Sequence, residues 1–143
     1  PAAFTDGTAY RLTAVAQTSM GNMGPTSILL RQGLTDPALE AGEWLVPPTG
    51  VSITRSGATF TPTEGALAHF VQWRDTRGDT VLEMLILDGS TEVEVPALVA
   101  LPSTGITTGG VQAIGADFDL DDFSLDDDRR LLWGLAGQPA DLQ

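Results

Sequence analysis

Residues 66–87 constrain the fold more than any other stretch of the chain. In the first arm, ALAHFVQW, the side chains at alternate positions form two distinct faces, which is the period of a β-strand. The second arm, VLEMLIL, is apolar at almost every position, and DTRGD between the arms is a turn sequence. The stretch therefore predicts a β-hairpin. Because an isolated hairpin is not stable in water, the rest of the chain must supply further strands.

The parity of the two arms decides which side chains of this hairpin share a face. With the turn centred on residues 76–78, one face is strongly apolar and must be covered. It carries Leu67, Val71, Trp73, Leu82, Met84 and Ile86. The opposite face is interrupted by Glu83 but is also largely apolar. Since both faces need cover, we expect the hairpin to lie centrally in its sheet and not at an edge.

Six further short segments have the composition of strands and are separated by glycine, proline and aspartate turns. They are residues 8–17, 27–31, 51–55, 58–61, 91–95 and 110–116. Together with the hairpin they give seven or eight strands at even spacing. This pattern is typical of an all-β protein with an antiparallel β-sandwich, which we expect to occupy residues 1–119.

The end of the chain, residues 120–143, differs in character from the rest. It begins as an acidic segment and continues with leucines at helical spacing, Leu131, Leu132 and Leu135. Ser124 followed by three aspartates resembles a helix start with negative charge in its first turn. We therefore expect a short C-terminal helix that packs on the sandwich.

Charge and composition exclude several classes of function. The net charge of −12 and the scattered arginines disfavour binding to nucleic acid. No apolar run is long enough to cross a bilayer, so we expect no membrane insertion. The absence of cysteine leaves no disulfide and no thiolate metal site. The chain does not begin with Met, so we expect a processed or excised piece from which a signal peptide would already be missing.

Four aspartates form the one candidate metal site. Asp117, Asp119 and Asp121 have the alternating spacing that places carboxylates around calcium, and Asp128 falls where such a loop has its last acidic ligand. The glycine of a complete calcium loop is replaced by Asp122. The alternative is a solvated acidic linker that caps the following helix. No other cofactor is expected.

Candidate residues for ligand binding and catalysis are few. Trp44 and Trp133 could stack on a sugar, although packing at the ends of the sandwich is the alternative. His69 is the single histidine, and no nucleophile motif accompanies it, so we do not expect an enzyme.

Two short motifs match known signals. Arg77-Gly78-Asp79 matches an integrin-binding tripeptide and also a simple hairpin turn, and residues 101–105, LPSTG, match a sortase signal without the apolar and basic segments that should follow it. We interpret the tripeptide as a turn sequence and LPSTG as part of a proline-bounded crossing segment, and we do not expect anchoring to the cell wall.

Four segments together resemble the fibronectin-III-like or immunoglobulin-like accessory domains of bacterial secreted and surface proteins. They are EWLVPPTG, the hairpin with Trp73 and DTRGD, DGSTEVEVPAL and the beginning of DFDLDDF, and the resemblance covers residues 42–119. The resemblance implies a β-sandwich that spaces, adheres or binds, without a particular ligand. It does not extend to the cysteine pair of antibody-type domains.

From these observations we expect a non-catalytic binding, adhesion or spacer module of a secreted or cell-surface bacterial protein, with a protein or glycan partner. One alternative is a structural subunit of a fibre or appendage, in which the tail, residues 118–135, docks on a neighbouring copy and forms an oligomer. Another is a carbohydrate-binding module.

Overall fold

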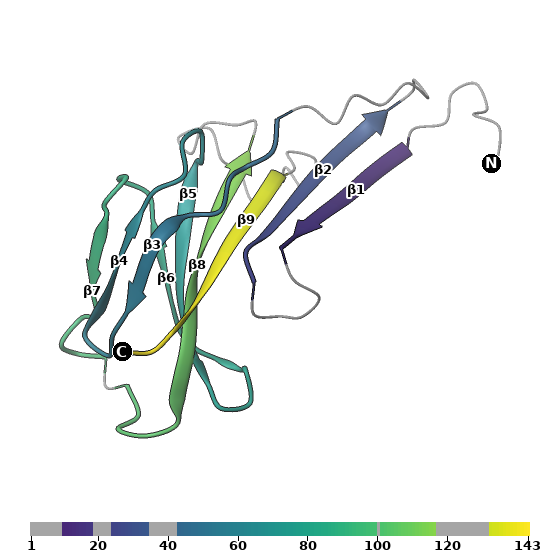
Figure 1. The fold of residues 1–143 in the computed structure, drawn as a ribbon. Coiled ribbons are helices and arrows are strands. Elements are labelled where there is room, and N and C mark those ends of the chain that lie inside the picture. Colours follow the sequence, from purple (N-terminus) through teal and green to yellow (C-terminus); the bar gives the residue numbers. More distant parts are fainter. Residues whose placement is uncertain (1–9, 19–23, 35–42, 100, 117–131) are drawn as a thin grey trace.

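The computed structural model describes residues 10–18, 24–34, 43–99, 101–116 and 132–143. In these ranges the regular elements are nine β-strands (Figure 1). They are β1 (Tyr10–Gln17), β2 (Thr26–Leu34), β3 (Thr49–Ile53), β4 (Gly57–Thr61), β5 (Ala68–Asp75), β6 (Thr80–Ile86), β7 (Glu92–Glu94), β8 (Ile106–Ala116) and β9 (Leu132–Asp141). The first eight overlap the eight segments that the sequence predicts. None of the described residues belongs to a helix that could cross a membrane.

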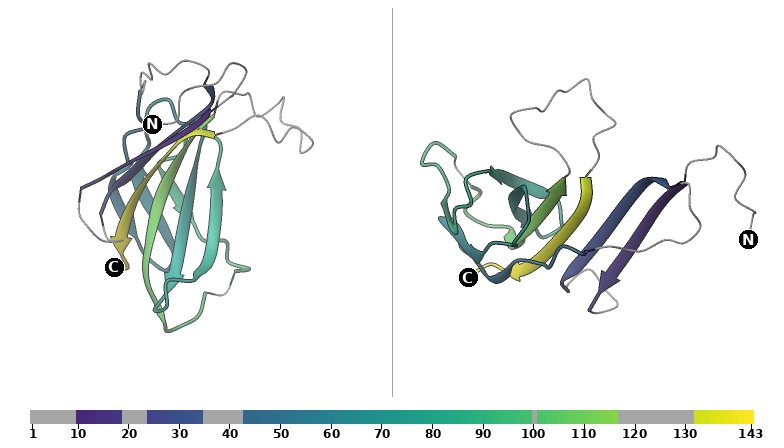
Figure 2. Two further views of the ribbon diagram at one scale, coloured as in Figure 1. Left: turned by 90° about the vertical axis from the view of Figure 1, so that its right-hand side faces the viewer. Right: turned by 90° about the horizontal axis from the view of Figure 1, so that it is seen from above.

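The strands form two antiparallel sheets that face each other (Figure 2). The larger sheet has six strands in the order β1-β2-β9-β8-β5-β6, and the smaller has three in the order β3-β4-β7. One apolar cluster joins them: Ile53, Phe60 and Val93 from the smaller sheet pack with Val71 and Trp73 from the larger. The predicted all-β, antiparallel sandwich architecture is therefore confirmed.

The central hairpin forms as the sequence predicts, with Val71 opposite Met84 and Trp73 opposite Leu82. The Trp73 side chain is completely buried, and its Nε1 donates a hydrogen bond of 2.8 Å to the carbonyl oxygen of Thr54. This bond matters because a buried indole N–H without a partner would cost free energy. The hairpin side chains thus anchor the larger sheet to the loop after β3.

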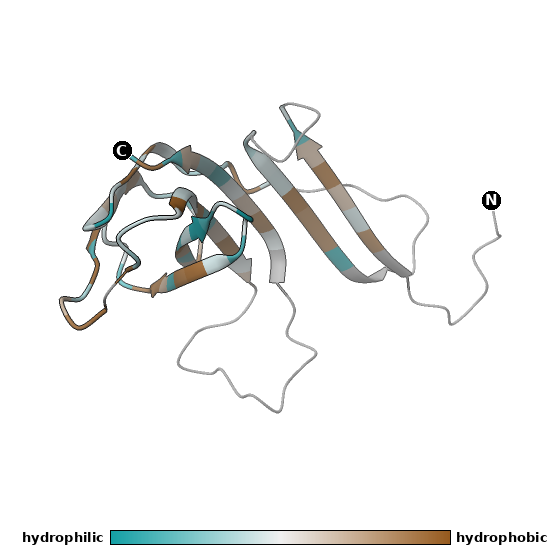
Figure 3. Ribbon diagram, turned by 90° about the horizontal axis from the view of Figure 1, so that it is seen from below, coloured by the Kyte–Doolittle hydropathy of each residue, from teal (hydrophilic) through white to brown (hydrophobic). Residues whose placement is uncertain are grey.

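The prediction that the hairpin lies away from the sheet edge is wrong for its second arm. In the described part of the chain, β6 pairs only with β5 and ends the larger sheet. Its outer face keeps apolar side chains in solvent: Leu85 is 48% exposed and Leu87, just beyond the strand, 52%. Figure 3 shows hydrophobic residues along this side of the molecule. Leu98, in the loop after β7, is 99% exposed. Apolar character in β6 therefore does not mean burial on both faces.

The predicted C-terminal helix is also corrected. Residues 132–141 form β9, which lies between β2 and β8 in the larger sheet. The leucine spacing suggested a helix, but Gly134, Gly137 and Pro139 each disfavour a helix interior. In the sheet, Gly134 packs directly under Leu45. A Cβ at position 134 would lie only 3.4 Å from the Leu45 side chain, so glycine suits this close contact. Close packing against neighbours therefore overrides the helical spacing. Residues 124–131 lie outside the described residues.

An extended segment, residues 43–48, completes the second layer where the smaller sheet ends. Leu45 from this segment is buried against Ala113 and Ala136 of the larger sheet. The Ser27 hydroxyl on β2 donates a hydrogen bond of 2.7 Å to the Leu45 carbonyl oxygen. Pro48 is fully buried. The extended segment that contains Pro47-Pro48 is thus part of the core layer.

Candidate binding groove

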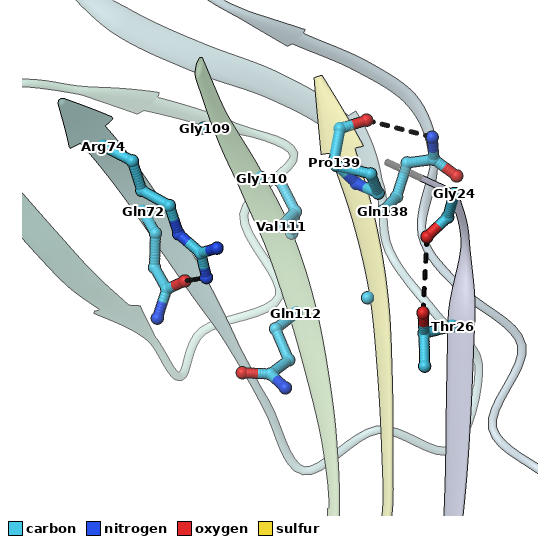
Figure 4. Close-up of a pocket in the computed structure, with 11 residues that line it drawn as sticks. Gly24, Thr26, Gln72, Arg74, Gly109, Gly110, Val111, Gln112, Gln138 and Pro139 are labelled. Carbon is cyan, nitrogen blue, oxygen red and sulfur yellow. Dashed lines mark hydrogen bonds between the residues drawn. The ribbon is translucent and has the colours of Figure 1, made fainter. Parts of the chain in front are cut away.

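A groove lies on the outer face of the larger sheet, over β5, β8 and β9 (Figure 4). Its floor is open because Gly110 on β8 and Gly137 on β9 carry no side chains. Gly110 pairs with Gln72 and Pro139, and Gly137 pairs with Gln112. The resulting hollow has a volume of about 140 Å³. We call it the polar groove, and its lining residues are Gly24, Thr26, Gln72, Arg74, Gly109, Gly110, Val111, Gln112, Gly137, Gln138 and Pro139.

Two consecutive glycines in β8, Gly109 and Gly110, lie on opposite faces of the larger sheet. A Cβ on Gly109 would lie 2.4 Å from the Gln72 carbonyl oxygen and 2.8 Å from Cδ1 of Ile53, so this position must be glycine for the two sheets to pack. A Cβ on Gly110 would meet the Gln138 carbonyl oxygen at 3.0 Å. Glycine inside a strand often marks such a close approach. The core thus requires one glycine, and the other opens the floor of the groove.

A hydrogen-bonded chain of three side chains forms one wall of the polar groove. Arg74 Nη2 donates to Gln72 Oε1 at 2.7 Å, and Gln72 Nε2 donates to the carboxylate of Glu83 on β6. The Gln72 amide therefore has a fixed orientation between a cation and an anion. A guanidinium has five N–H donors, so Arg74 retains donors beyond the one bound to Gln72.

The remaining walls present amides and a hydroxyl. The Gln112 amide is half-buried and has no hydrogen-bond partner among the described residues. Gln138 is paired with Val111, whose side chain faces the core, and its Nε2 donates to the Pro139 carbonyl oxygen at 3.0 Å. The Thr26 hydroxyl donates to the Gly24 carbonyl oxygen at 3.3 Å (Figure 4). The groove therefore offers donors and acceptors in one hollow.

A second hollow of about 430 Å³ shares Arg74, Gly109 and Pro139 with the polar groove. It adds Arg77 from the β5–β6 turn and Asp141 from the end of β9. Two of the seven cationic side chains of the chain thus line this end, although the net charge is −12. The local charge favours an anionic group more than the chain as a whole does.

Trp44, a candidate from the sequence, lines a separate hollow of about 580 Å³. We call it the Trp44 hollow, and its lining residues are Glu43, Trp44, Val46, Pro47, Thr49, Pro62, Thr63, Glu64 and Gly65. Trp44 is half-buried, and Val46 is 65% exposed. The other tryptophan candidate, Trp133, lies in β9, and its side chain is outside the described residues.

The other sequence candidates do not assemble into a reactive site in the described residues. His69 is 4% exposed, and its Nε2 accepts a hydrogen bond of 3.0 Å from the Thr63 backbone N–H. Burial lowers the pKa of His69 from its ordinary value of 6.5. The imidazole is therefore held neutral, as a structural acceptor.

The proposed calcium ligands Asp117, Asp119, Asp121 and Asp128 lie outside the described residues. In the described ranges, no three histidine or carboxylate side chains come close enough to hold a metal ion. Calcium binding by the acidic segment therefore stays a prediction.

Arg77, Gly78 and Asp79 form the turn between β5 and β6. Gly78 has a φ of 88°, and Asp75 Oδ1 accepts hydrogen bonds from the N–H groups of Arg77 and Asp79 at 2.8 and 3.0 Å. Gly105, at the end of the LPSTG sequence, also has a positive φ, of 90°. The tripeptide thus belongs to a turn, and LPSTG lies in the connection before β8. In a simple hairpin, Arg74 could pair with Asp79 across the turn. Here the Arg74 guanidinium donates a hydrogen bond to Gln72.

The polar groove escapes prediction because its residues come from separate strands and form no motif. A faint signal exists: glycine within a strand with glutamine nearby, as in TTGGVQ, which has two adjacent glycines, and LAGQP, which has one. Comparison with known protein families, with curated proteins and with solved structures gave no match. The fold and the groove therefore define only the structural class of the protein. It is a two-sheet antiparallel β-sandwich with a polar hollow on the outer face of its larger sheet.

Proposed function

We propose that this protein is a non-catalytic binding module of a secreted or cell-surface bacterial protein, and that the polar groove holds a glycan chain. The observation that supports this most directly is the groove itself. Amide and guanidinium groups surround a glycine floor, on strands that are paired on both sides. Such a surface recognises a ligand without rearrangement of the backbone, which lowers the entropic cost of binding.

The chemistry of the groove matches that of sugars. Each sugar hydroxyl both donates and accepts hydrogen bonds, and a glutamine amide offers one group of each kind. Within the part of the chain that the structure describes, the Gln112 side-chain amide has no hydrogen-bond partner to give up. The adjoining hollow provides room beyond a single sugar ring, and Arg74 and Arg77 in it favour a glycan with carboxylate groups. An acidic polysaccharide is therefore the preferred ligand.

The resemblance to fibronectin-III-like and immunoglobulin-like accessory domains supports the same role, because such modules bind or space and leave catalysis to other domains. It also supports the secreted or surface location that we propose. In this proposal the strands supply rigidity, and the ligand contacts come from a sheet face and not only from loops.

The test is a screen of neutral and acidic polysaccharides, followed by calorimetric titration of any that bind. Gly137→Val should abolish binding, because the new side chain would fill the floor, whereas a Cβ there is 4.0 Å from its nearest neighbour, Val111 O, and leaves the fold intact. Gln112→Ala should weaken binding. Thr59→Val, on the exposed face of β4, is the control and should bind normally. Failure of every polysaccharide, or normal binding by Gly137→Val, would contradict the proposal.

A second candidate function, a structural subunit of an assembly, is favoured by β6. An edge strand with exposed apolar side chains is a template for pairing with another chain. If this role holds, the molecular mass in solution should rise with concentration, and Leu85→Lys should keep the protein monomeric. A monomer at all concentrations would exclude the β6 route. Docking through residues 118–135 involves mostly residues outside the described ranges and stays a separate prediction.

A further inference from the structure

The Trp44 hollow has the size of a ligand site and does not overlap the polar groove. Its volume of about 580 Å³ lies in the range of small-molecule sites, about 300 to 1,000 Å³. The lining combines the Trp44 side chain with Pro47, Pro62 and the exposed side chain of Val46. These groups form an apolar surface that stays in contact with solvent.

Internal hydrogen bonds hold the two segments that form this hollow. The Thr63 hydroxyl donates to the Val46 carbonyl oxygen at 2.7 Å, which ties one segment to the other. The Thr63 backbone N–H donates to His69 Nε2, and the Leu45 carbonyl oxygen accepts from Ser27. The last two of these bonds are buried and are therefore shielded from water. The hollow is therefore preformed in the absence of a ligand.

The charged groups around the hollow are both acidic. Glu43 and Glu64 line it and are exposed, and no arginine of the described ranges takes part in its lining. An apolar aromatic surface flanked by two carboxylates suits a flat cation with an apolar stem. Arginine fits best, since its guanidinium stacks on an aromatic ring and pairs with carboxylates through parallel N–H bonds, whereas a lysine ammonium is compact and strongly hydrated.

We propose that the Trp44 hollow binds an arginine side chain from a basic segment of a partner protein. A second copy of this chain fits less well. Its exposed turn carries Arg77 together with Asp75 and Asp79, so it would bring more negative than positive charge to Glu43 and Glu64. The net charge of −12 adds long-range repulsion between copies and attraction to a basic partner.

The experiment compares three capped tripeptides that differ in the central residue: Gly-Arg-Gly, Gly-Lys-Gly and Gly-citrulline-Gly. Citrulline keeps nearly the shape of arginine but carries no charge. Binding is followed through the amide NMR signals of Glu64 and Gly65 and the indole signal of Trp44. We expect the arginine peptide to bind with a millimolar Kd, and the citrulline peptide about fivefold more weakly, as expected for loss of a charge-assisted contact of about 1 kcal/mol.

Variants place the binding at the hollow. Trp44→Ala should weaken binding of the arginine peptide by about fivefold, which is the upper range for an exposed cation–π contact. The double variant E43Q/E64Q should weaken it by about threefold to tenfold, from two exposed charge pairs. The matched control is E92Q/E94Q, which removes the same charge from the exposed side chains of β7 and should leave these signals and the affinity unchanged. Amide spectra of each variant show whether the fold is kept.

Several results would overturn the proposal. Equal affinity for the arginine and citrulline peptides would show that charge is not recognised. No response of the Trp44, Glu64 and Gly65 signals to the arginine peptide at millimolar concentration, or a response only to a neutral sugar, would remove arginine as the ligand. Concentration-dependent self-association that Trp44→Ala abolishes would identify a second copy as the occupant instead. None of these outcomes depends on the polar groove, so the glycan proposal stands or fails separately.

Discussion

The backbone N–H of Thr63 donates a hydrogen bond of 3.0 Å to Nε2 of His69. The imidazole is 4% exposed and lies against the Phe60 ring, with 5.3 Å between the ring centroids. Nε2 accepts this bond only when it carries no proton, so the native structure requires the neutral imidazole. The loop that contains Thr63 is thereby linked to the protonation state of a core residue.

The first prediction concerns pH. Because burial lowers the pKa of His69 below 6.5, the unfolded chain binds a proton more readily than the folded one. The contribution of His69 to stability is complete above pH 6.5 and is lost as the pH falls from 6.5 through the lowered pKa. Urea midpoints at pH 7.5 and 5.5 should show this loss, and His69→Gln should show a smaller one. An equal loss in both proteins would assign it to other groups.

The second prediction contrasts two glycines on neighbouring strands. Gly109→Ala would place a Cβ 2.4 Å from the Gln72 carbonyl oxygen, so we expect a loss of about 2 to 3 kcal/mol or failure to fold, as for overpacked cores. Gly137→Ala has open space and should be neutral or stabilise by up to about 1 kcal/mol, because alanine restricts the unfolded chain. Chemical denaturation measures both. Similar values for the two variants would mean that the sheets do not approach closely at Gly109.

The third prediction tests the core. Trp73→Ala should cost about 3 to 5 kcal/mol, because it removes the largest fully buried side chain and leaves the Thr54 carbonyl oxygen without its donor. Leu98→Ser, at a position that is 99% exposed, should change stability by less than about 0.5 kcal/mol. Urea unfolding followed by circular dichroism distinguishes the two. A Trp73→Ala protein of nearly normal stability would contradict the described packing.

The fourth prediction concerns the turn between β5 and β6. Asp75→Ala removes the acceptor for two backbone N–H groups and should cost about 1 to 2 kcal/mol. Asp88→Ala, in the next turn, removes the acceptor for one backbone N–H, that of Ser90, together with the Ser90 hydroxyl, and should cost less because only one of these bonds fixes the backbone. Thermal unfolding of the two variants gives the comparison. A larger effect at Asp88 would show that the Asp75 bonds contribute little.

The hairpin could be predicted from sequence because strand parity is local. Alternation alone places Val71 and Trp73 with Leu82 and Met84, and the observed register agrees. The position of β6 at the sheet edge could not be predicted, because burial on the second face depends on which strands are neighbours. Val81 and Leu85 are apolar yet exposed, so hydrophobic composition overstated their burial.

β9 and the polar groove were missed for a related reason. Leucines at helical spacing indicated a helix, whereas Gly134 between them and Gly137 and Pro139 after them fit a strand, and Gly134 packs under Leu45. The groove depends on Gly110 and Gly137 lying side by side with Gln112, and that relationship exists only once β9 has paired with β8. A sequence shows which residues are small, but not which small residues meet across a sheet.

The place of β9 has a consequence for the order in which the molecule can be completed. β1 and β2 precede every other strand, yet β2 joins the larger sheet only through β9, which follows all of them in the chain. Synthesis proceeds at about 5 to 20 residues per second. Until β9 leaves the ribosome, β2 and β8 therefore each have one edge whose backbone N–H and C=O groups lack their native strand partner. Closure between such distant segments is slow, so this interval is when the nascent chain most needs protection from other chains.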